Sequence, residues 1–214
     1  MDAIFYEPPI ETNYLGHILK EVYVDRVYGQ LLDGKSGLTI VDVGANIGVT
    51  SNYFSQFASK VYSIEPSESH MKCLREMVRF NKNENITPIQ VAIYSKDCEL
   101  DFGHNQNKTM YSLHTAVWDK DLGTEKVRAV TLDTLFKEQK IDHVDFMKLD
   151  VEGSEHEILG SDTFDLVANK IDSILVEHHV WSNRNPNQLR EALRTRGFRA
   201  NYIPNDATLI YGTK

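Results

Sequence analysis

A buried strand that leads directly into a glycine-containing turn is the feature that most restricts the fold. Residues 38–43 form a nearly continuous apolar run, and Gly44 and Gly48 follow it. A run of this kind is typical of a strand in a parallel sheet that helices cover on both faces. Apolar residues recur at helical spacing over about 47–58, which predicts a helix there. Strand, turn and helix together indicate the first unit of an α/β fold.

Strands and helices continue to alternate along the chain. Further strands are expected over residues 60–65, 86–94, 127–131, 144–150 and 171–177. Helices are expected over residues 68–80, 132–135, 154–159 and 187–196. The segments 198–203 and 207–211 are expected to form a closing hairpin. We therefore predict a Rossmann-like α/β fold with a mostly parallel seven-stranded sheet, helices on both faces and a C-terminal antiparallel hairpin.

Two parts of the chain do not fit this alternation. Residues 1–36 are expected to form an N-terminal helical extension before the main domain, which covers residues 37–214. Apolar residues recur at helical spacing between Leu15 and Val27, and the glycines at 34 and 37 end that pattern. Residues 103–126 are rich in polar side chains and are expected to form an irregular insertion.

Charge and composition limit the classes of partner. The formal net charge is −8, no cluster of Lys and Arg is visible, and duplex nucleic acid is bound mainly through cationic contacts to phosphates. No apolar run is long enough to span a membrane, and the first residues lack the pattern of a signal peptide. Two cysteines are too few for a disulfide framework. We therefore expect a cytoplasmic protein that binds neither nucleic acid nor membranes.

The turn after the first strand favours a ligand without phosphate groups. The dinucleotide-binding fingerprint places glycine at three positions so that a pyrophosphate can approach the backbone, but the middle position here is Asn46. This argues against a nicotinamide-dependent dehydrogenase. S-adenosylmethionine needs no such clearance, and its carboxylate can accept hydrogen bonds from amides at the start of a helix. Gly44 suits the tight turn, and Gly48 is expected to let the helix pack close to the strand.

An acidic residue ends the next predicted strand. Glu65 is its last residue, and Pro66 stops it. A carboxylate at this position can accept hydrogen bonds from both hydroxyl groups of a ribose. The D-x-G-x-x-x-G pattern of residues 42–48 and the Glu-Pro pair together predict a binding site for the nucleoside part of S-adenosylmethionine.

Two more acids lie at the end of the strand predicted over 144–150. Asp150 finishes a buried strand, where a charged group is costly unless it is used. Glu152 follows at the same edge of the sheet. Both are therefore expected to face the bound donor. Glu155 begins the next helix, where a favourable interaction with the helix dipole explains an acid equally well.

Four sequence blocks resemble the FkbM family of methyltransferases. They are VDVGANIG at 41–48, EP at 65–66, VTLDTL at 130–135 and DFMKLDVEGSEHEIL at 145–159. The resemblance implies a class I methyltransferase fold and O-methylation, often of sugar or polyketide hydroxyls, with S-adenosylmethionine as the donor. By motif match it implies the cofactor residues Asp42, Gly44, Asn46, Gly48 and Glu65, and it assigns to the LDVEG block Asp150, Glu152 and Gly153. We also assign Ala92 to the cofactor site.

The acceptor is expected to be a small molecule, either a carbohydrate or a glycosylated metabolite, and the chain could pair as a homodimer. The resemblance is weakest at residues 1–36 and 103–126, and substrate choice usually lies in such parts. Glu152 is expected to contact the acceptor. Trp118 and Trp181 could line a sugar pocket, although packing explains them as well.

A hydroxyl group loses a proton when it is methylated, so a base assists the reaction. Glu177 and His178 end the strand expected beside that of Asp150. We therefore name Asp150, Glu177 and His178 as catalytic candidates that face one cleft, and one of them takes the proton. Alternative sources of a base in the polar insertion are His104, Tyr111 and His114.

The same three residues, Asp150, Glu177 and His178, could instead bind a divalent metal ion, because catechol-type methyltransferases place acids at these strand ends. Mg²⁺ favours oxygen ligands, and a histidine fits that preference poorly. No metal ligand is therefore assigned from the sequence.

Two other functions stay open. Nucleic-acid amino methyltransferases share this fold but usually carry an Asn/Asp-Pro-Pro-aromatic block where this chain has Leu-Asp-Val-Glu at 149–152. The absence of that block argues against this class. A module that binds the donor without turnover is the second, because the N-terminal region that would build an acceptor pocket is short.

Overall fold

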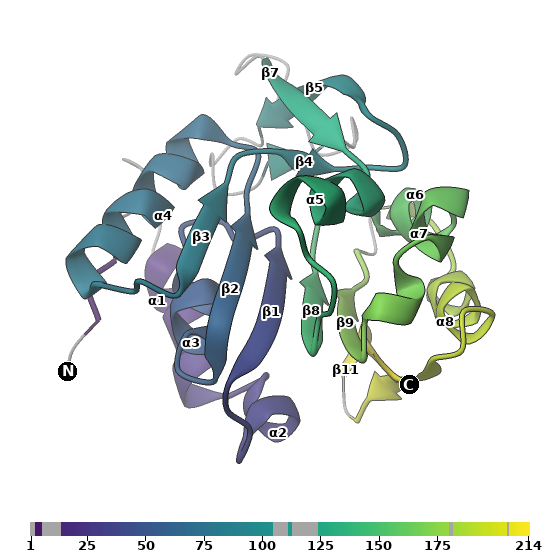
Figure 1. The fold of residues 1–214 in the computed structure, drawn as a ribbon, viewed down its shortest axis with the longest axis horizontal. Helices are drawn as coiled ribbons and strands as arrows, with labels where there is room; N and C mark the ends of the chain where they lie inside the picture. Colours follow the sequence, from purple (N-terminus) through teal and green to yellow (C-terminus); the bar gives the residue numbers. More distant parts are fainter. Residues whose placement is uncertain (1–2, 6–13, 105–110, 113–123, 180–181, 205) are drawn as a thin grey trace.

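The computed structural model describes residues 3–5, 14–104, 111–112, 124–179, 182–204 and 206–214. These residues form a seven-stranded main sheet, helices on both of its faces, and a second sheet of four strands (Figure 1). Within this part of the chain, no helix is both long enough and apolar enough to cross a membrane.

The main sheet has the strand order β10-β11-β9-β8-β1-β2-β3. Its strands are β1 Leu38–Val43, β2 Ala58–Ile64, β3 Ile86–Ile89, β8 Phe146–Leu149, β9 Ser173–Glu177, β10 Arg199–Ile203 and β11 Asp206–Thr213. The strand β1 pairs in parallel with β2 and β8, whereas β11 is antiparallel to both of its neighbours. The predicted sheet and its C-terminal antiparallel hairpin are therefore confirmed.

Alternate side chains of the strands pack against two helical layers. Ile40 belongs to a buried cluster with the helices α1 Tyr14–Leu19, η1 Lys20–Val24, α2 Gly29–Leu32, α3 Val49–Phe54 and α4 Glu68–Asn81. Val41 and Val43 belong to a second cluster, with the helices α5 Leu132–Gln139, α6 Glu155–Leu159, α7 Asp162–Asp165 and α8 Pro186–Arg194, and with the short turn η3 Ala168–Lys170. The period of two along a strand explains why its neighbouring residues face different layers.

Side-chain caps fix the starts of two long helices. Ser67 accepts a hydrogen bond from the backbone N–H of His70 at the start of α4, and Thr131 does the same for Thr134 at the start of α5. Each cap satisfies a backbone donor that the first helical turn leaves without a partner. These capping residues explain why the predicted start of α4 is correct.

The N-terminal extension is more broken than the single predicted helix. The π-helix η1 follows α1 directly, and Arg26, at φ +52°, separates η1 from α2. Val22, Tyr28 and Leu32 from these segments are nonetheless buried in one cluster with Phe54 of α3. The extension therefore shares the core of the main sheet.

The second sheet includes both ends of the expected irregular insertion, residues 103–126, of which 105–110 and 113–123 lie outside the described residues. Its strands lie in the order β4-β7-β5-β6 and are β4 Ala92–Ile93, β5 Cys98–His104, β6 Tyr111–Ser112 and β7 Thr124–Val130. Phe102, Val127 and Ala129 are buried between these strands, so a small apolar core stabilises them. The strand predicted over 86–94 is also divided, because β3 pairs with β2 while β4 pairs with β7.

Candidate functional site

The turn after β1 is anchored to the end of β2. The backbone N–H groups of Gly44 and Ala45 both donate to the carbonyl oxygen of Ile64, at 3.0 and 2.9 Å. Gly44 has φ +81°, and a Cβ atom there would lie 1.7 Å from the carbonyl oxygen of Asp150. Glycine is therefore required both by the turn and by the close approach of the chain after β8.

Gly48 has a different neighbour from the one expected. It has φ +93° and precedes α3, and a Cβ atom there would lie 2.5 Å from Cε of Met77 and 3.1 Å from Cγ of Leu74. Both of these residues belong to α4. The missing side chain of Gly48 thus makes room for α4, whereas the sequence analysis expected it to bring α3 close to the strand.

Glu65 holds the turn and its own loop together. Its Oε2 atom accepts a hydrogen bond from the backbone N–H of Asn46, and its Oε1 atom accepts one from the backbone N–H of Ser67, both at 2.9 Å. The carboxylate is buried yet lines a cavity at the carboxyl ends of the strands. Each of its oxygens has a second lone pair with which it can accept a hydrogen bond from a ligand.

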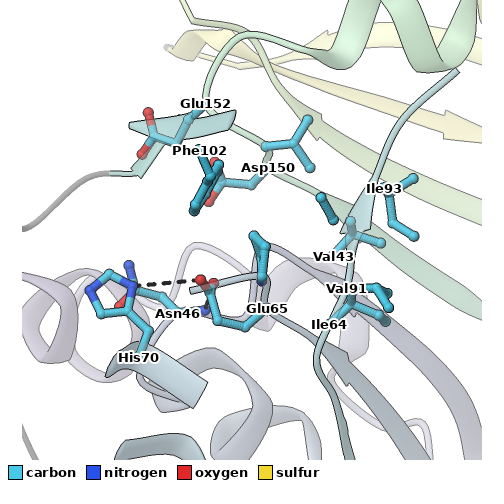
Figure 2. A pocket seen from close by; sticks show the side chains of 14 residues that line it. Val43, Asn46, Ile64, Glu65, His70, Val91, Ile93, Phe102, Asp150 and Glu152 are labelled. Carbon is cyan, nitrogen blue, oxygen red and sulfur yellow. Dashed lines mark hydrogen bonds and ion pairs between the residues drawn. The ribbon is translucent and has the colours of Figure 1, made fainter. Parts of the chain in front are cut away.

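The cavity has two polar sides that face each other. It encloses about 560 Å³ of empty space, including open solvent at its mouth. Figure 2 shows Asn46 and Glu65 on one side, here named the loop side, and Asp150 and Glu152 opposite them, here named the acid side. The apolar residues of its wall include Val43, Ile64, Val91, Ile93 and Phe102.

The predicted cofactor residues divide into two groups by position. Gly44, Asn46, Glu65 and Ala92 line the cavity. Gly48 and Asp42 are not among the residues that line it.

A buried lysine that the sequence analysis did not single out lies beneath the turn. Lys148 donates hydrogen bonds to Asp150 Oδ2 at 2.9 Å and to the carbonyl oxygen of Gly44 at 3.1 Å, and its Nζ atom is 3.6 Å from Asp42 Oδ1. Asp42 also accepts a hydrogen bond from Ser51 Oγ at 2.6 Å. Burial raises the pKa of the Asp42 carboxyl. Burial also acts to lower the pKa of Lys148, but the two aspartates outweigh it and hold the value well above the usual range.

The turn after β8 is held by Glu155. Its Oε1 atom accepts hydrogen bonds from the backbone N–H groups of Val151 and Gly153, at 3.1 and 3.2 Å. Glu152, between them, has φ +53°, a conformation that costs a residue other than glycine about 1–3 kcal/mol. Glu155 is therefore more than an acid at a helix start, because it stabilises the strained turn that presents Glu152 to the cavity.

His179, and not His178, contacts the acids. Its Nδ1 atom is 2.8 Å from Glu155 Oε1, while its Nε2 atom is 3.3 Å from Glu152 Oε2, 3.5 Å from Asp150 Oδ1 and 4.0 Å from Glu177 Oε1. Burial acts to lower the pKa of His179, but the hydrogen bond to Glu155 and the charge of Asp150 raise it to about 10. These contacts join β9 to the turn after β8.

The strand of His178 lies beside that of Asp150, as predicted, but His178 does not face the cavity with Asp150. Its ring packs at 5.8 Å from that of His156 on α6, and it is not among the residues that line the cavity. The strand period explains this result, because His178 shares the face of Val176, whereas Glu177 and His179 continue the face of Leu175.

The carboxyl groups of the acid side affect one another. Burial and the charge of Asp150 raise the pKa of Glu152 to about 8. The charge of Asp150 and burial raise the pKa of Glu177 to about 8. Burial acts to raise the pKa of Asp150 itself, but the charges of Lys148 and His179 hold it below the usual range. Glu177 is not among the residues that line the cavity. It lies beside the acid side, because its Oε1 atom is 4.0 Å from Nε2 of His179.

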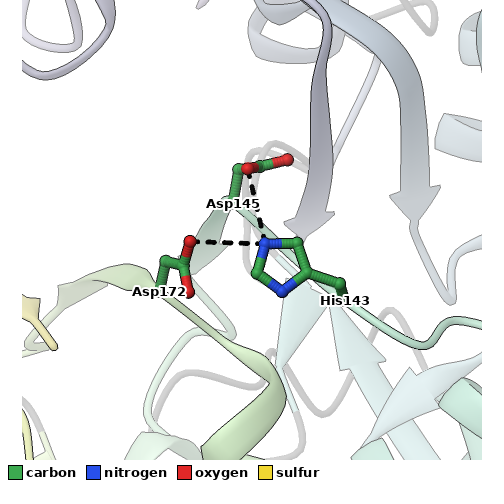
Figure 3. A group of neighbouring side chains, drawn as sticks. All are labelled: His143, Asp145 and Asp172. Atoms are coloured by element: carbon green, nitrogen blue, oxygen red, sulfur yellow. Dashed lines mark ion pairs between the residues drawn. The ribbon is translucent and has the colours of Figure 1, made fainter.

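A second cluster, of an imidazole and two carboxylates, lies at the amino-terminal ends of the strands, whereas the cavity lies at their carboxyl ends (Figure 3). His143 Nε2 is 3.4 Å from Asp145 Oδ1 and 3.3 Å from Asp172 Oδ2. Asp145 also accepts a hydrogen bond from the backbone N–H of Thr39 at 2.7 Å. These residues lie at the amino ends of β1, β8 and β9, so the cluster joins strand starts and is remote from the cavity.

Several sequence candidates cannot be located. His114, Trp118 and Trp181 lie outside the described residues, and so do the side chains of His104 and Tyr111.

The fold is that of class I methyltransferases. Similar solved structures include a precorrin-6y C5,15-methyltransferase from Geobacter metallireducens, with 12% identity, TM-score 0.53, and coverage of 89% of this chain and 88% of the other. An S-adenosylmethionine-dependent methyltransferase from Aquifex aeolicus has 14% identity, TM-score 0.52, and coverage of 91% and 90%. An rRNA methylase from Streptococcus thermophilus has 12% identity, TM-score 0.51, and coverage of 90% and 95%.

The family follows from the sequence itself. The family model described as the methyltransferase FkbM domain matches residues 42–200, which is most of the chain. No curated protein matched the sequence. The chain belongs to the FkbM methyltransferase family and is an S-adenosylmethionine-dependent methyltransferase, so the resemblance seen in its four sequence blocks is confirmed.

Proposed function

We propose that the protein transfers the methyl group of S-adenosylmethionine to a hydroxyl group of a small molecule, a carbohydrate or a glycosylated metabolite. The observation that carries this proposal is the cavity whose loop side and acid side face each other. A methyl donor on the loop side would present its methyl group toward carboxylates that can orient a hydroxyl group and remove its proton. Alignment of two reactants in this way supplies much of the rate of a methyl transfer.

On the loop side, Glu65 is the residue that would bind the donor ribose. Its carboxylate lines the cavity, and both of its oxygens already accept backbone hydrogen bonds that fix their position. Gly44, Asn46 and Ala92 would form the rest of the donor wall. Asp42 and Gly48 would act indirectly, Asp42 through Lys148 and Gly48 through the packing of α4.

On the acid side, Asp150 and Glu177 would orient the acceptor, and Glu152 would contact it directly. Asp150 and Glu152 line the cavity, and Glu177 adjoins them through His179. A carboxylate that accepts a hydrogen bond from the acceptor hydroxyl is placed to take its proton. The role that the sequence analysis gave to His178 is not carried forward, because its ring packs on α6.

The extension of residues 1–36 would complete the acceptor side of the main domain, residues 37–214. Glu21 on η1 is partly buried, and burial raises its pKa while the charge of Lys148 opposes this increase. Glu21 of the extension therefore interacts electrostatically with Lys148 and Asp150. A pocket of carboxylates on a chain of net charge −8 favours a neutral, hydroxyl-rich acceptor over a polyanion such as a nucleic acid.

Methylation of a panel of acceptors tests this function. The protein is incubated with S-adenosylmethionine carrying a labelled methyl group and with sugars, glycosides, RNA or DNA. The expected product is a methyl ether on a sugar or glycoside, located by mass spectrometry. Methylation of nucleic acid alone, or of nitrogen or carbon, would contradict the proposal. Donor binding without turnover on any acceptor would favour the donor-binding module.

Changing Glu65 to alanine should weaken binding of S-adenosylmethionine by about 10- to 100-fold. A hydrogen bond to a charged group contributes about 1.5–3 kcal/mol, and about 1.4 kcal/mol corresponds to a factor of ten. Calorimetry with S-adenosylmethionine and with NAD, which should not bind, measures the effect. Glu84→Ala removes an exposed acid beyond α4 and should leave donor affinity unchanged. Equal affinities of the wild type and Glu65→Ala would refute the role of Glu65.

A further inference from the structure

The orientation of the His179 ring gives its two nitrogens different partners. The Nδ1 atom lies 2.8 Å from Glu155 Oε1, and an ionised carboxylate can only accept a hydrogen bond. Nδ1 therefore donates its hydrogen to Glu155 in either protonation state of the ring, and Nε2 is the nitrogen that would give up its proton when a metal ion binds. Histidine ligands of metal ions almost always donate their other ring N–H to a carboxylate, a carbonyl group or a water molecule in this way.

Two carboxylate oxygens lie from Nε2 at the separation expected of ligands that share one metal ion. Carboxylate oxygens of Glu152, Asp150 and Glu177 lie 3.3, 3.5 and 4.0 Å from it. These separations exceed the usual N–H···O distance of about 2.9–3.0 Å. Ligand atoms that each lie about 2.0–2.2 Å from one metal ion are about 3.0–3.5 Å apart. A proton on Nε2 can point at one of these oxygens, whereas an ion between them contacts several.

The charge of the surrounding network and the burial of Glu155 also favour a metal ion at this place. Carboxylates outnumber cationic side chains in this network, which consists of Asp42, Asp150, Glu152, Glu155, Glu177, Lys148 and His179. Asp150, Glu155 and His179 each place a ligand-type atom within 4.8 Å of the others. Glu155 is fully buried, and its Oε2 atom has no hydrogen-bond partner among the described residues. A divalent cation would compensate this excess of negative charge.

We propose that Asp150, Glu152 and His179 bind a divalent transition-metal ion, with Glu155 orienting the imidazole and Glu177 beside the ion. One imidazole among carboxylates suits Mn²⁺ or a similar ion better than Mg²⁺, which prefers oxygen ligands alone. The ligand set differs from Asp150, Glu177 and His178, the one considered from the sequence, because His179 replaces His178 and Glu152 replaces Glu177 as a ligand. The inference deepens the proposed function and rests on it for its catalytic meaning, since the ion would face the acceptor hydroxyl and ease the loss of its proton.

Binding of Mn²⁺ alone, without donor or acceptor, tests the site. Free Mn²⁺ gives an electron paramagnetic resonance signal that is lost on binding, so a titration of the full chain yields affinity and stoichiometry. The wild type should bind one ion tightly. Glu155→Gln, which changes the group that orients the imidazole, should weaken binding by about 10- to 100-fold. His179→Gln and Glu152→Gln remove ligands and should weaken it at least as much.

Two matched variants control for other histidines. His178→Gln changes the neighbouring imidazole that packs on α6, and His143→Gln changes the exposed cluster of Figure 3. Both should bind Mn²⁺ like the wild type. Loss of binding in His143→Gln alone, or no binding by the wild type, would overturn the proposal.

Circular dichroism of each variant separates loss of the site from loss of the fold. Glu152 is partly exposed, so Glu152→Gln keeps the test valid even where His179→Gln fails to fold. Unchanged Mn²⁺ affinity in a folded Glu152→Gln would also count against the site. Because binding is measured without substrates, failure to bind Mn²⁺ removes only the metal site. Tight binding without methylation of any hydroxyl would instead remove only the proposed function.

Discussion

Gly44→Ala should destabilise the protein by about 2–6 kcal/mol, or prevent it from folding. The added Cβ would lie 1.7 Å from the carbonyl oxygen of Asp150, and a backbone atom cannot move aside as a flexible side chain can. Overpacking of a well-packed site typically costs about 1–3 kcal/mol or more. The φ angle of +81° adds about 1–3 kcal/mol for a residue with a Cβ. Urea unfolding followed by circular dichroism measures the loss.

Gly34→Ala separates the clash from the backbone strain. Gly34 has φ +76°, close to that of Gly44, but no atom lies within 4 Å of a Cβ built there. Its substitution should therefore cost only about 1–2 kcal/mol, the cost of the left-handed conformation. Equal losses in the two variants would show that the approach of Gly44 to Asp150 has no influence on stability.

Lys148→Met should lower the free energy of unfolding by about 3–5 kcal/mol, the usual cost of breaking a buried ion pair by removing one partner. Methionine fills a similar volume, so the lost interactions are mainly electrostatic. Asp42, which is completely buried, then loses the charge that compensates it, and Asp150 loses a hydrogen bond of 2.9 Å. Thermal and urea unfolding at neutral pH measure this effect.

The double variant Asp42→Asn/Lys148→Met should recover part of the stability, because it removes the uncompensated charge. Lys137→Met is the matched control, since Lys137 pairs with Asp133 one helical turn away while its side chain is 72% exposed. An exposed pair of this kind contributes about 0.3–0.5 kcal/mol. A loss in Lys148→Met as small as that in Lys137→Met would contradict the importance of the buried pair.

Most of the main sheet could be predicted because its strands are continuous apolar runs. Residues 38–43 were predicted as a strand with the bounds that β1 has in the structure. Of the second sheet, β7 was largely predicted, as a strand over 127–131, whereas β5 was missed. The alternation of Leu100 and Phe102 with Glu99 and Asp101 is typical of a half-buried strand and could have indicated β5. The division between β3 and β4 was missed as well, since a change of pairing partner leaves no mark in apolar periodicity.

The loop side of the site was easier to predict than the acid side. Gly44, Asn46 and Glu65 belong to a local motif, and the structure brings them to one cavity. Contacts on the acid side depend on which face of β9 each residue takes, and the sequence analysis placed Glu177 and His178 in one cleft. The period of two puts these neighbours on opposite faces and puts His179 on the face of Glu177.

The position of Lys148 within an apolar segment could also have indicated a buried ion pair. Lys148 stands within the apolar segment 146–149, as Asp42 stands within the apolar segment 38–43. Two opposite charges in adjacent buried strands are costly unless they pair, and the structure aligns these two residues directly across β1 and β8. Glu155 could not be recognised in this way, because the start of a helix already accounts for an acid.

The position of the Lys148 ammonium group makes the two sides of the cavity thermodynamically dependent on each other. One cation holds the carbonyl oxygen of Gly44 at 3.1 Å and the carboxylate of Asp150 at 2.9 Å. A shift of the Gly44 carbonyl on the loop side therefore reaches a carboxylate on the acid side through a single group. Binding free energies obey reciprocity. Any factor by which an occupant of one side changes affinity at the other is returned by the same factor, and we expect that linkage to pass through Lys148.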